Sequence, residues 1–130
     1  MNRSKFQFSN PELEKIVFSV NQSYEESKFD GISMQSNTEV KKLDGNKAKV
    51  SLTITIGNDT DTQPFHICIT MSANFIWEDD IDDVMAKQLL NMNAPAVLLS
   101  YIRPIVSSLT NSSKYPTLNI PFIDFTQNES

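Results

Sequence analysis

Two neighbouring segments in which apolar and polar residues alternate constrain the fold of this chain more than any other feature. Lys49–Ile56 carries apolar residues at its even positions, and Phe65–Trp77 carries them at its odd positions. A period of two residues is typical of a β-strand with one buried face, because successive side chains of a strand point to opposite sides. The segment between them, Gly57–Asp61, is rich in turn-forming residues. The two segments are therefore predicted to form an antiparallel hairpin with one apolar face.

Further strands are predicted upstream of this hairpin. Ile32–Leu43 alternates more weakly and leads into Asp44–Asn46, where the Asp-Gly pair readily adopts the positive φ angles of a tight turn. Lys15–Asn21 is a further apolar segment and a predicted strand. A short strand at Phe6–Phe8 can precede it, with Pro11 between the two. Together these segments predict a four-stranded antiparallel β-meander.

After the second alternating segment the apolar period lengthens to three and four residues, which indicates helix. The acidic residues of Glu78–Asp83 suit the positive end of a helix dipole, so a helical stretch is expected to open there. A fresh helix is predicted to start at Asn93 as N-cap, with Pro95 in its first turn, and Pro104 is expected to bend it. The predicted fold class is α+β, with a long C-terminal helix packed on one face of the sheet.

The composition excludes several classes of function. A length of 130 residues suits a single domain covering 1–130. A net charge of −5 argues against binding nucleic acid, which needs clustered cations. The sequence contains no apolar run of about 18 residues and no apolar stretch typical of a secretion signal near its start. We therefore expect no membrane insertion and a cytoplasmic location.

The residues that could carry chemistry are few. The chain has one His and one Cys, so an internal disulfide and a site with two histidines are excluded. His66 and Cys68 lie two residues apart on one strand, but a nucleophilic pair also needs an orienting group and an oxyanion pocket, and the sequence indicates neither. The three glycines are not grouped as a phosphate-binding loop requires. We predict a protein that is not an enzyme and uses no metal or cofactor.

Two motifs stand out in the last third of the chain. The first is a small residue followed by Pro-x-x-Leu-x-x-Tyr-x-Arg, and its positions are filled by Ala94, Pro95, Leu98, Tyr101 and Arg103. The second is an extended aromatic-Pro-x-Leu segment, filled by Tyr115, Pro116, Leu118, Asn119, Ile120, Asp124 and Phe125. In this order and spacing the motifs resemble the SecB family of bacterial protein-export chaperones. The predicted strands and the acidic entrance to the helix also agree with that family, so the resemblance covers nearly the whole chain.

The resemblance implies an ATP-independent chaperone that holds unfolded polypeptides or preproteins in an apolar groove, assembles as a dimer or a dimer of dimers, and can deliver clients to SecA. The best candidates for the groove are large apolar residues, although such side chains are more often buried in a core: Phe75, Trp77, Tyr115, Leu118, Ile120 and Phe122. Asp59 and Asp61, at the tip of the hairpin, are candidates for contact with SecA, with a plain polar turn as the alternative. The helix motif implies a subunit interface or a structural role, with an ion pair expected for Arg103: Pro95, Leu98, Tyr101, Arg103 and Ile105.

The chain departs from the family pattern in three places. Ser100 stands where the family has a proline, and Pro104 where it usually has an acidic residue. The sequence also stops five residues after Phe125, so the family's second helix and SecA-binding tail are expected to be missing or vestigial. Two other functions therefore stay open: a SecB-like chaperone of a toxin–antitoxin module or another non-export protein, and a small-molecule-binding α+β domain. The last would need a pocket with converging polar groups.

Overall fold

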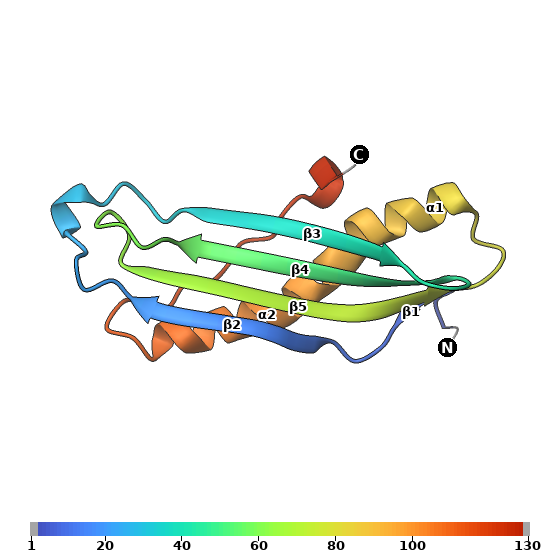
Figure 1. Cartoon of the computed structure of the whole chain (residues 1–130), viewed down its shortest axis with the longest axis horizontal. Coiled ribbons are helices and arrows are strands. Elements are labelled where there is room, and N and C mark those ends of the chain that lie inside the picture. The colour runs from blue at the N-terminus through green and yellow to red at the C-terminus, as the bar shows by residue number, and fades with distance from the viewer. Residues whose placement is uncertain (1–2, 129–130) are drawn as a thin grey trace.

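The computed structural model of the chain describes residues 3–128. It contains a five-stranded antiparallel sheet with one long helical segment crossing behind it (Figure 1). The strands are β1 (Phe6–Phe8), β2 (Glu12–Val20), β3 (Met34–Lys42), β4 (Lys47–Gly57) and β5 (Phe65–Trp77). The helical elements are η1 (Glu26–Lys28), α1 (Asp83–Gln88), the π-helical turn η2 (Leu89–Asn93), α2 (Ala94–Asn111) and η3 (Phe125–Asn128). The predicted α+β class is confirmed.

The strand order differs from a simple four-stranded meander. β3, β4 and β5 are consecutive antiparallel neighbours, but β1 and β2 both pair with β5, end to end along the same edge (Figure 1). Proline has no N–H to donate to a sheet, and Pro11 lies in the gap between β1 and β2. Because β2 and β3 lie at opposite edges, the connection between them, residues 21–33, crosses one end of the sheet.

The core lies between one face of the sheet and α2. In the β4–β5 pair, Leu52 is opposite Met71 and Ile54 is opposite Ile69, so the apolar sets of both strands share one face. Exclusion of this face from water is the main favourable contribution to folding. The side chains that α2 buries follow its helical period: Ala94, Pro95, Leu98, Leu99, Ile102, Val106 and Thr110.

The helical segment starts where the acidic residues predicted it. Asp82 is the N-cap, and its carboxylate accepts a hydrogen bond of 2.8 Å from the backbone N–H of Met85. The predicted cap at Asn93 is wrong, because Asn93 has helical angles (φ −76°, ψ −41°) and makes no capping hydrogen bond. The chain passes from α1 to α2 through the wider turn η2. Such a turn accommodates Pro95, which cannot donate to a carbonyl one turn earlier.

Gly57 ends β4 at a position that tolerates no side chain. Its φ is +68°, and a Cβ there would lie 1.9 Å from the carbonyl oxygen of Phe65. We expect Gly57→Ala to lower the free energy of unfolding by about 3 kcal/mol or more, because it adds a backbone clash to the strain of a positive φ. Urea denaturation would measure this.

Gly45→Ala is the matched control for that substitution. Gly45 also has a positive φ, +73°, but nothing lies within 4 Å of its would-be Cβ. Gly45→Ala should therefore lower the free energy of unfolding only by the conformational cost of a positive φ, about 1–2 kcal/mol. Equal losses for the two variants would contradict the close approach of Gly57 and Phe65.

Candidate functional site

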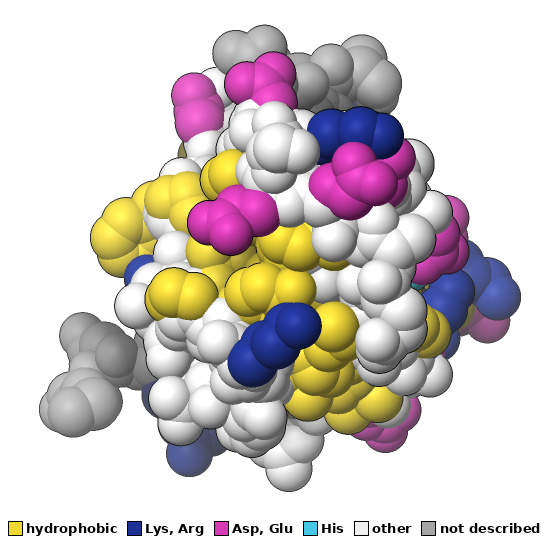
Figure 2. Space-filling model, turned by 90° about the vertical axis from the view of Figure 1, so that its left-hand side faces the viewer, with side chains coloured by type: hydrophobic (Ala, Val, Ile, Leu, Met, Phe, Trp, Pro, Cys, Tyr) yellow, Lys and Arg dark blue, Asp and Glu magenta, His cyan; other side chains and the backbone are white. Residues whose placement is uncertain are grey.

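An apolar pocket of about 370 Å³ lies at the end of the sheet where residues 21–33 cross over. This volume falls within the range of about 300–1,000 Å³ typical of ligand sites. Figure 2 looks onto this end of the molecule and shows hydrophobic side chains gathered across it. Three segments far apart in the sequence supply the lining: Tyr24, Glu26, Phe29, Ile32, Pro64, Phe65, Tyr115, Pro116, Thr117 and Leu118.

Aromatic rings in edge-to-face contact build the walls of this pocket, which we call the aromatic pocket. The ring of Tyr24 lies 6.3 Å from that of Phe29 and 6.0 Å from that of Tyr115, centroid to centroid, with interplanar angles of 85°. Phe65, the first residue of β5, lies 5.9 Å from Tyr115. This geometry is favourable for aromatic pairs because the positive edge of one ring meets the negative face of the next. The contacts join the crossover to the segment after α2.

The crossover has little regular structure, and a buried amide holds it in place. Gln63 is only 5% exposed. Its Nε2 donates to the carbonyl oxygen of Gly31 over 2.9 Å, and its Oε1 accepts from the backbone N–H of Ser33 over 3.0 Å. At the start of the crossover, Asn21 Nδ2 donates to the carbonyl oxygen of Gln63 over 2.8 Å. These bonds tie the crossover to the residues that lead into β5.

Ionisable groups at this end act mainly to position the chain. Lys28 Nζ lies 2.8 Å from a carboxylate oxygen of Asp61 and 3.2 Å from one of Glu25. Hydrogen bonds to Asp61 and then Glu25 raise the pKa of Lys28 above its ordinary value. Burial, followed by the charge of Glu26, raises the pKa of Tyr24 above its ordinary value. Exposed ion pairs contribute little to stability.

Two of the six residues predicted for a groove, Tyr115 and Leu118, line the aromatic pocket. Phe75 and Ile120 have no exposed surface and belong to the core. Trp77 is 7% exposed and lies at the opposite end of β5, beside a second cavity. The structure therefore does not bring these five residues to one surface.

The sixth residue, Phe122, is 87% exposed and packs against Arg103. The Arg103 guanidinium lies 4.7 Å from the centre of the Phe122 ring, and its Nε donates to the carbonyl oxygen of Ile120 over 2.7 Å. These contacts take the place of the expected ion pair within the described residues. Nearby, the N–H of Leu118 donates to Thr110 Oγ1 over 2.8 Å. Polar side chains of α2 thus hold the extended segment that follows it.

The other residues of the helix motif divide between core and surface. Pro95 and Leu98 are buried, and Ile105 is half-buried. Tyr101 is 41% exposed, and its ring meets that of Phe8 edge-on at 6.4 Å. The motif therefore presents Tyr101 to the surface and uses Pro95 and Leu98 for packing.

The two acidic residues of the β4–β5 turn lie near the aromatic pocket, at the same end of the sheet. The Asp61 carboxylate pairs with Lys28, and its carbonyl oxygen accepts from the N–H of Glu25 over 2.8 Å, so it anchors the crossover. The Asp59 side chain is 78% exposed, with a carboxylate oxygen 3.7 Å from His66 Nδ1. Of the pair, Asp59 is the more open to a partner.

Three important residues of this site were missed by the sequence analysis: Tyr24, Phe29 and Gln63. Two large aromatic residues within a polar, turn-rich segment are a signal that could have indicated Tyr24 and Phe29. No comparable signal exists for Gln63, because its role depends on which carbonyl and N–H the crossover brings beside it.

The arrangement offers contacts for binding. Apolar and aromatic groups dominate the lining, and no nucleophile with an adjacent base occurs in it. Within residues 3–128 no three His, Cys, Asp or Glu side chains gather as a metal site would require. In the same part of the chain, no helix is both long and apolar enough to cross a membrane. The antiparallel sheet backed by one long helix thus carries an open apolar pocket at one end.

Comparison with known proteins identifies the family. The profile of the family described as preprotein translocase subunit SecB matches residues 8–128. This chain belongs to the SecB family, and that membership supports a chaperone role.

The proteins that are similar to this chain in sequence are distant relatives. The protein-export protein SecB of Anaplasma phagocytophilum (strain HZ) is 27% identical over 126 residues, which cover 91% of this chain and 80% of that protein. SecB of Anaplasma marginale (strain Florida) is 25% identical over 124 residues, with coverages of 91% and 71%. An uncharacterised protein of Methanocaldococcus jannaschii is 27% identical over 122 residues, with coverages of 90% and 77%.

Solved structures share the fold at lower identity. The Mycobacterium tuberculosis Rv1957 SecB-like chaperone, solved in complex with a ChAD peptide from the Rv1956 HigA1 antitoxin, superposes with a TM-score of 0.70 and 15% identity. The superposition covers 92% of this chain and 88% of that one. A Streptococcus agalactiae protein of unknown function gives a TM-score of 0.52 at 13% identity, with coverages of 90% and 97%.

Replacing Gln63 should release the crossover. Gln63→Ala removes the hydrogen bonds to the N–H of Ser33 and to the carbonyl of Gly31, which together contribute about 1–3 kcal/mol at the usual value of about 0.5–1.5 kcal/mol for each bond. We expect a loss of stability of that size and faster hydrogen exchange at the Ser33 amide. Gln35→Ala, at an exposed position of β3, should stay within about 0.5 kcal/mol. Unchanged exchange at Ser33 would refute the role of Gln63.

Proposed function

We propose that this chain is an ATP-independent holdase that binds extended apolar segments of unfolded polypeptides, with the aromatic pocket as an anchoring site. The observation that carries the proposal is the aromatic pocket itself, which is apolar and open to solvent. Contacts between aromatic rings hold its walls in place. Rigid aromatic walls supply contact area at little entropic cost, and such surfaces bind varied apolar side chains. Family membership supports the same role.

The surroundings of the pocket favour clients with basic residues beside their apolar ones. The chain carries a net charge of −5. Glu26 lies in the lining itself, and the exposed carboxylate of Asp59 lies at the same end of the sheet. Charges of this sign attract basic clients and speed their encounter with the pocket.

We also propose that the chain self-associates through the edge formed by β1 and β2. Phe8, Leu13 and Ile16 lie on the same face as the core, yet each is at least 40% exposed. Tyr101 of α2 extends this apolar surface at Phe8. Within the described residues the outer side of β2 pairs with no strand. An apolar surface beside a free strand edge is a typical place for association with a second copy.

Truncating Phe29 should weaken client holding. Phe29 is 43% exposed, so Phe29→Ser removes an anchor of the pocket with little loss from the core. We expect about tenfold weaker suppression of the aggregation of reduced insulin chains, measured by light scattering without ATP, as expected for a central aromatic contact.

Val84→Ser is the control, because Val84 is 71% exposed on α1 and does not line the aromatic pocket. Equal activity of the two variants would contradict a role of the aromatic pocket in client binding. Inactivity of the unmodified chain would contradict the holdase function.

Repeating the assay with purified SecA distinguishes a role in protein export from a role as the chaperone of one dedicated client. Holding without SecA binding would favour a chaperone for one client, such as an antitoxin; the similar Mycobacterium tuberculosis chaperone is named in complex with an antitoxin peptide.

A charge on the exposed edge should break self-association. Ile16 and Val17 are adjacent in β2 and similarly exposed, but Ile16 lies on the core side and Val17 on the opposite face. Ile16→Glu is expected to shift the mass measured by sedimentation towards the monomer, because it buries an unpaired charge in the contact. Val17→Glu should leave the mass unchanged. A monomeric unmodified chain would contradict the proposal.

A further inference from the structure

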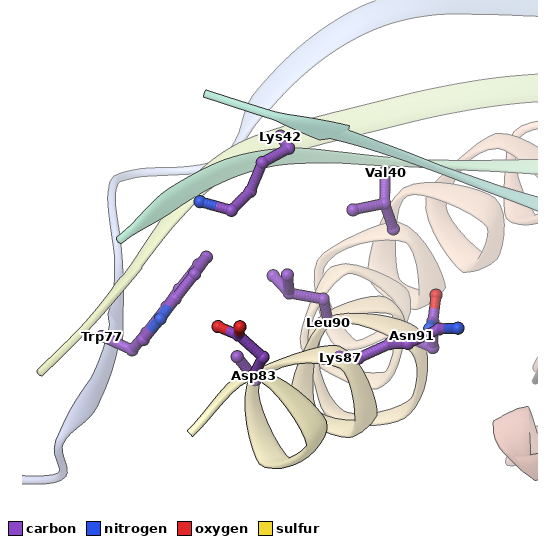
Figure 3. A pocket seen from close by; sticks show the side chains of 8 residues that line it. Val40, Lys42, Trp77, Asp83, Lys87, Leu90 and Asn91 are labelled. Carbon is purple, nitrogen blue, oxygen red and sulfur yellow. The ribbon is translucent and has the colours of Figure 1, made fainter. Parts of the chain in front are cut away.

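A second cavity, of about 310 Å³, lies at the opposite end of the sheet from the aromatic pocket. It opens between β3, the end of β5 and the first turns of the helical segment (Figure 3). A volume near the lower end of the range for ligand sites suits a small molecule. Its lining combines apolar and charged side chains: Val40, Lys42, Trp77, Asp83, Ala86, Lys87, Leu90 and Asn91.

The walls of this cavity are firmly held by the core. Trp77 is 7% exposed and Leu90 is 6% exposed, and both belong to the hydrophobic core cluster. Val40 projects from β3 towards them, and Figure 3 shows the three side chains around a common space. They offer one apolar guest a flat indole surface and two branched aliphatic side chains.

Lys42 and Asp83, which carry opposite charges, line the same space, and Lys87 is a second cation of the lining. The Lys42 ammonium lies 5.1 Å from the centre of the Trp77 ring and donates to the carbonyl oxygens of Leu43 and Gly45. An ammonium has three N–H donors, so one is left for a guest. Figure 3 shows the Asp83 carboxylate on the helix side of the cavity. Within the described residues no ion pair joins Lys42 and Asp83.

We propose that this cavity binds a free apolar α-amino acid of about the size of leucine. Its ammonium would bind the Asp83 carboxylate, its carboxylate would bind Lys42, and its side chain would pack on Trp77. A zwitterion is the guest that satisfies both charges. Lys42 and Asp83 are both exposed and charged. A purely apolar guest would pair with neither of them and a simple anion or cation with only one, whereas charged partners form the stronger hydrogen bonds.

The interior of a polypeptide is a weaker match for the same groups. Its N–H and C=O could reach Asp83 and Lys42, but neutral groups form weaker hydrogen bonds to such partners than charged ones do. The amino-acid site is also independent of the proposed holdase function, because it uses none of the residues of the aromatic pocket.

The test uses the fluorescence of Trp77, the single tryptophan of the chain, during titration of the full chain with L-leucine. We expect a saturable change in emission. N-acetyl-L-leucine lacks the ammonium and L-leucinamide lacks the carboxylate, so each should bind at least about tenfold more weakly, as for loss of a charged hydrogen bond. No saturable response to leucine, or equal responses to all three compounds, would overturn the inference.

Matched variants locate the site. Lys42→Met and Asp83→Asn should each weaken leucine binding at least about tenfold, with circular dichroism confirming that each variant is folded. Lys41→Met is the control, because Lys41 is adjacent in β3 but lies on the other face of the sheet, opposite Lys49. A response to an extended apolar peptide that leucine does not displace would overturn the amino-acid assignment and make the cavity a second polypeptide site.

Discussion

Burial of the alternating face of β4 and β5 beneath α2 is the interaction on which the rest of the structure depends. Ile54 and Ile69 lie opposite one another in this pair, and neither has any exposed surface. Each such side chain contributes about 1.5–3 kcal/mol on burial. Because β5 also pairs with β1 and β2, it is the central support of the sheet. Its 13 residues span about 40 Å, and the two cavities lie at its ends, beside Phe65 and Trp77.

Both cavities form where the chain leaves regular structure, which is where binding residues are commonly found on rigid scaffolds. At one end the crossover brings Tyr24 against Tyr115, and the buried Gln63 side chain holds the crossover through hydrogen bonds to the backbone of Gly31 and Ser33. At the other end, α1 starts at the Asp82 cap and brings Asp83 to face Lys42 and Trp77. The two sites differ in chemistry accordingly: the first has mainly aromatic walls, and the second adds opposite charges to apolar walls.

Local patterns predicted the elements well, and non-local contacts decided the sites. The alternation in Phe65–Trp77 predicted β5 to the residue, and the acidic entrance predicted the helix start. Asn93 was wrongly predicted as a cap. An Asn followed two residues later by Pro is typical of a helix start, but the same residues can also lie inside a continuous helical segment. In the site, Tyr115 and Leu118 were predicted from motif residues. Tyr24 was not, since its contact with Tyr115 joins segments about 90 residues apart in the chain. Phe29 was not either, and its ring packs against that of Tyr24.

The sequence by itself determined that this protein has an antiparallel sheet with one apolar face, a long helix to cover that face, and the motifs of the SecB family. These properties reside in the order and period of neighbouring residues, which act on local conformation and on burial. Only the tertiary structure decided that β2 pairs with β5, that the crossover spans the end of the sheet, and that Lys42 and Asp83 face one another across a cavity. Strand pairing and loop placement depend on contacts between distant segments, and no local period encodes which segments will meet.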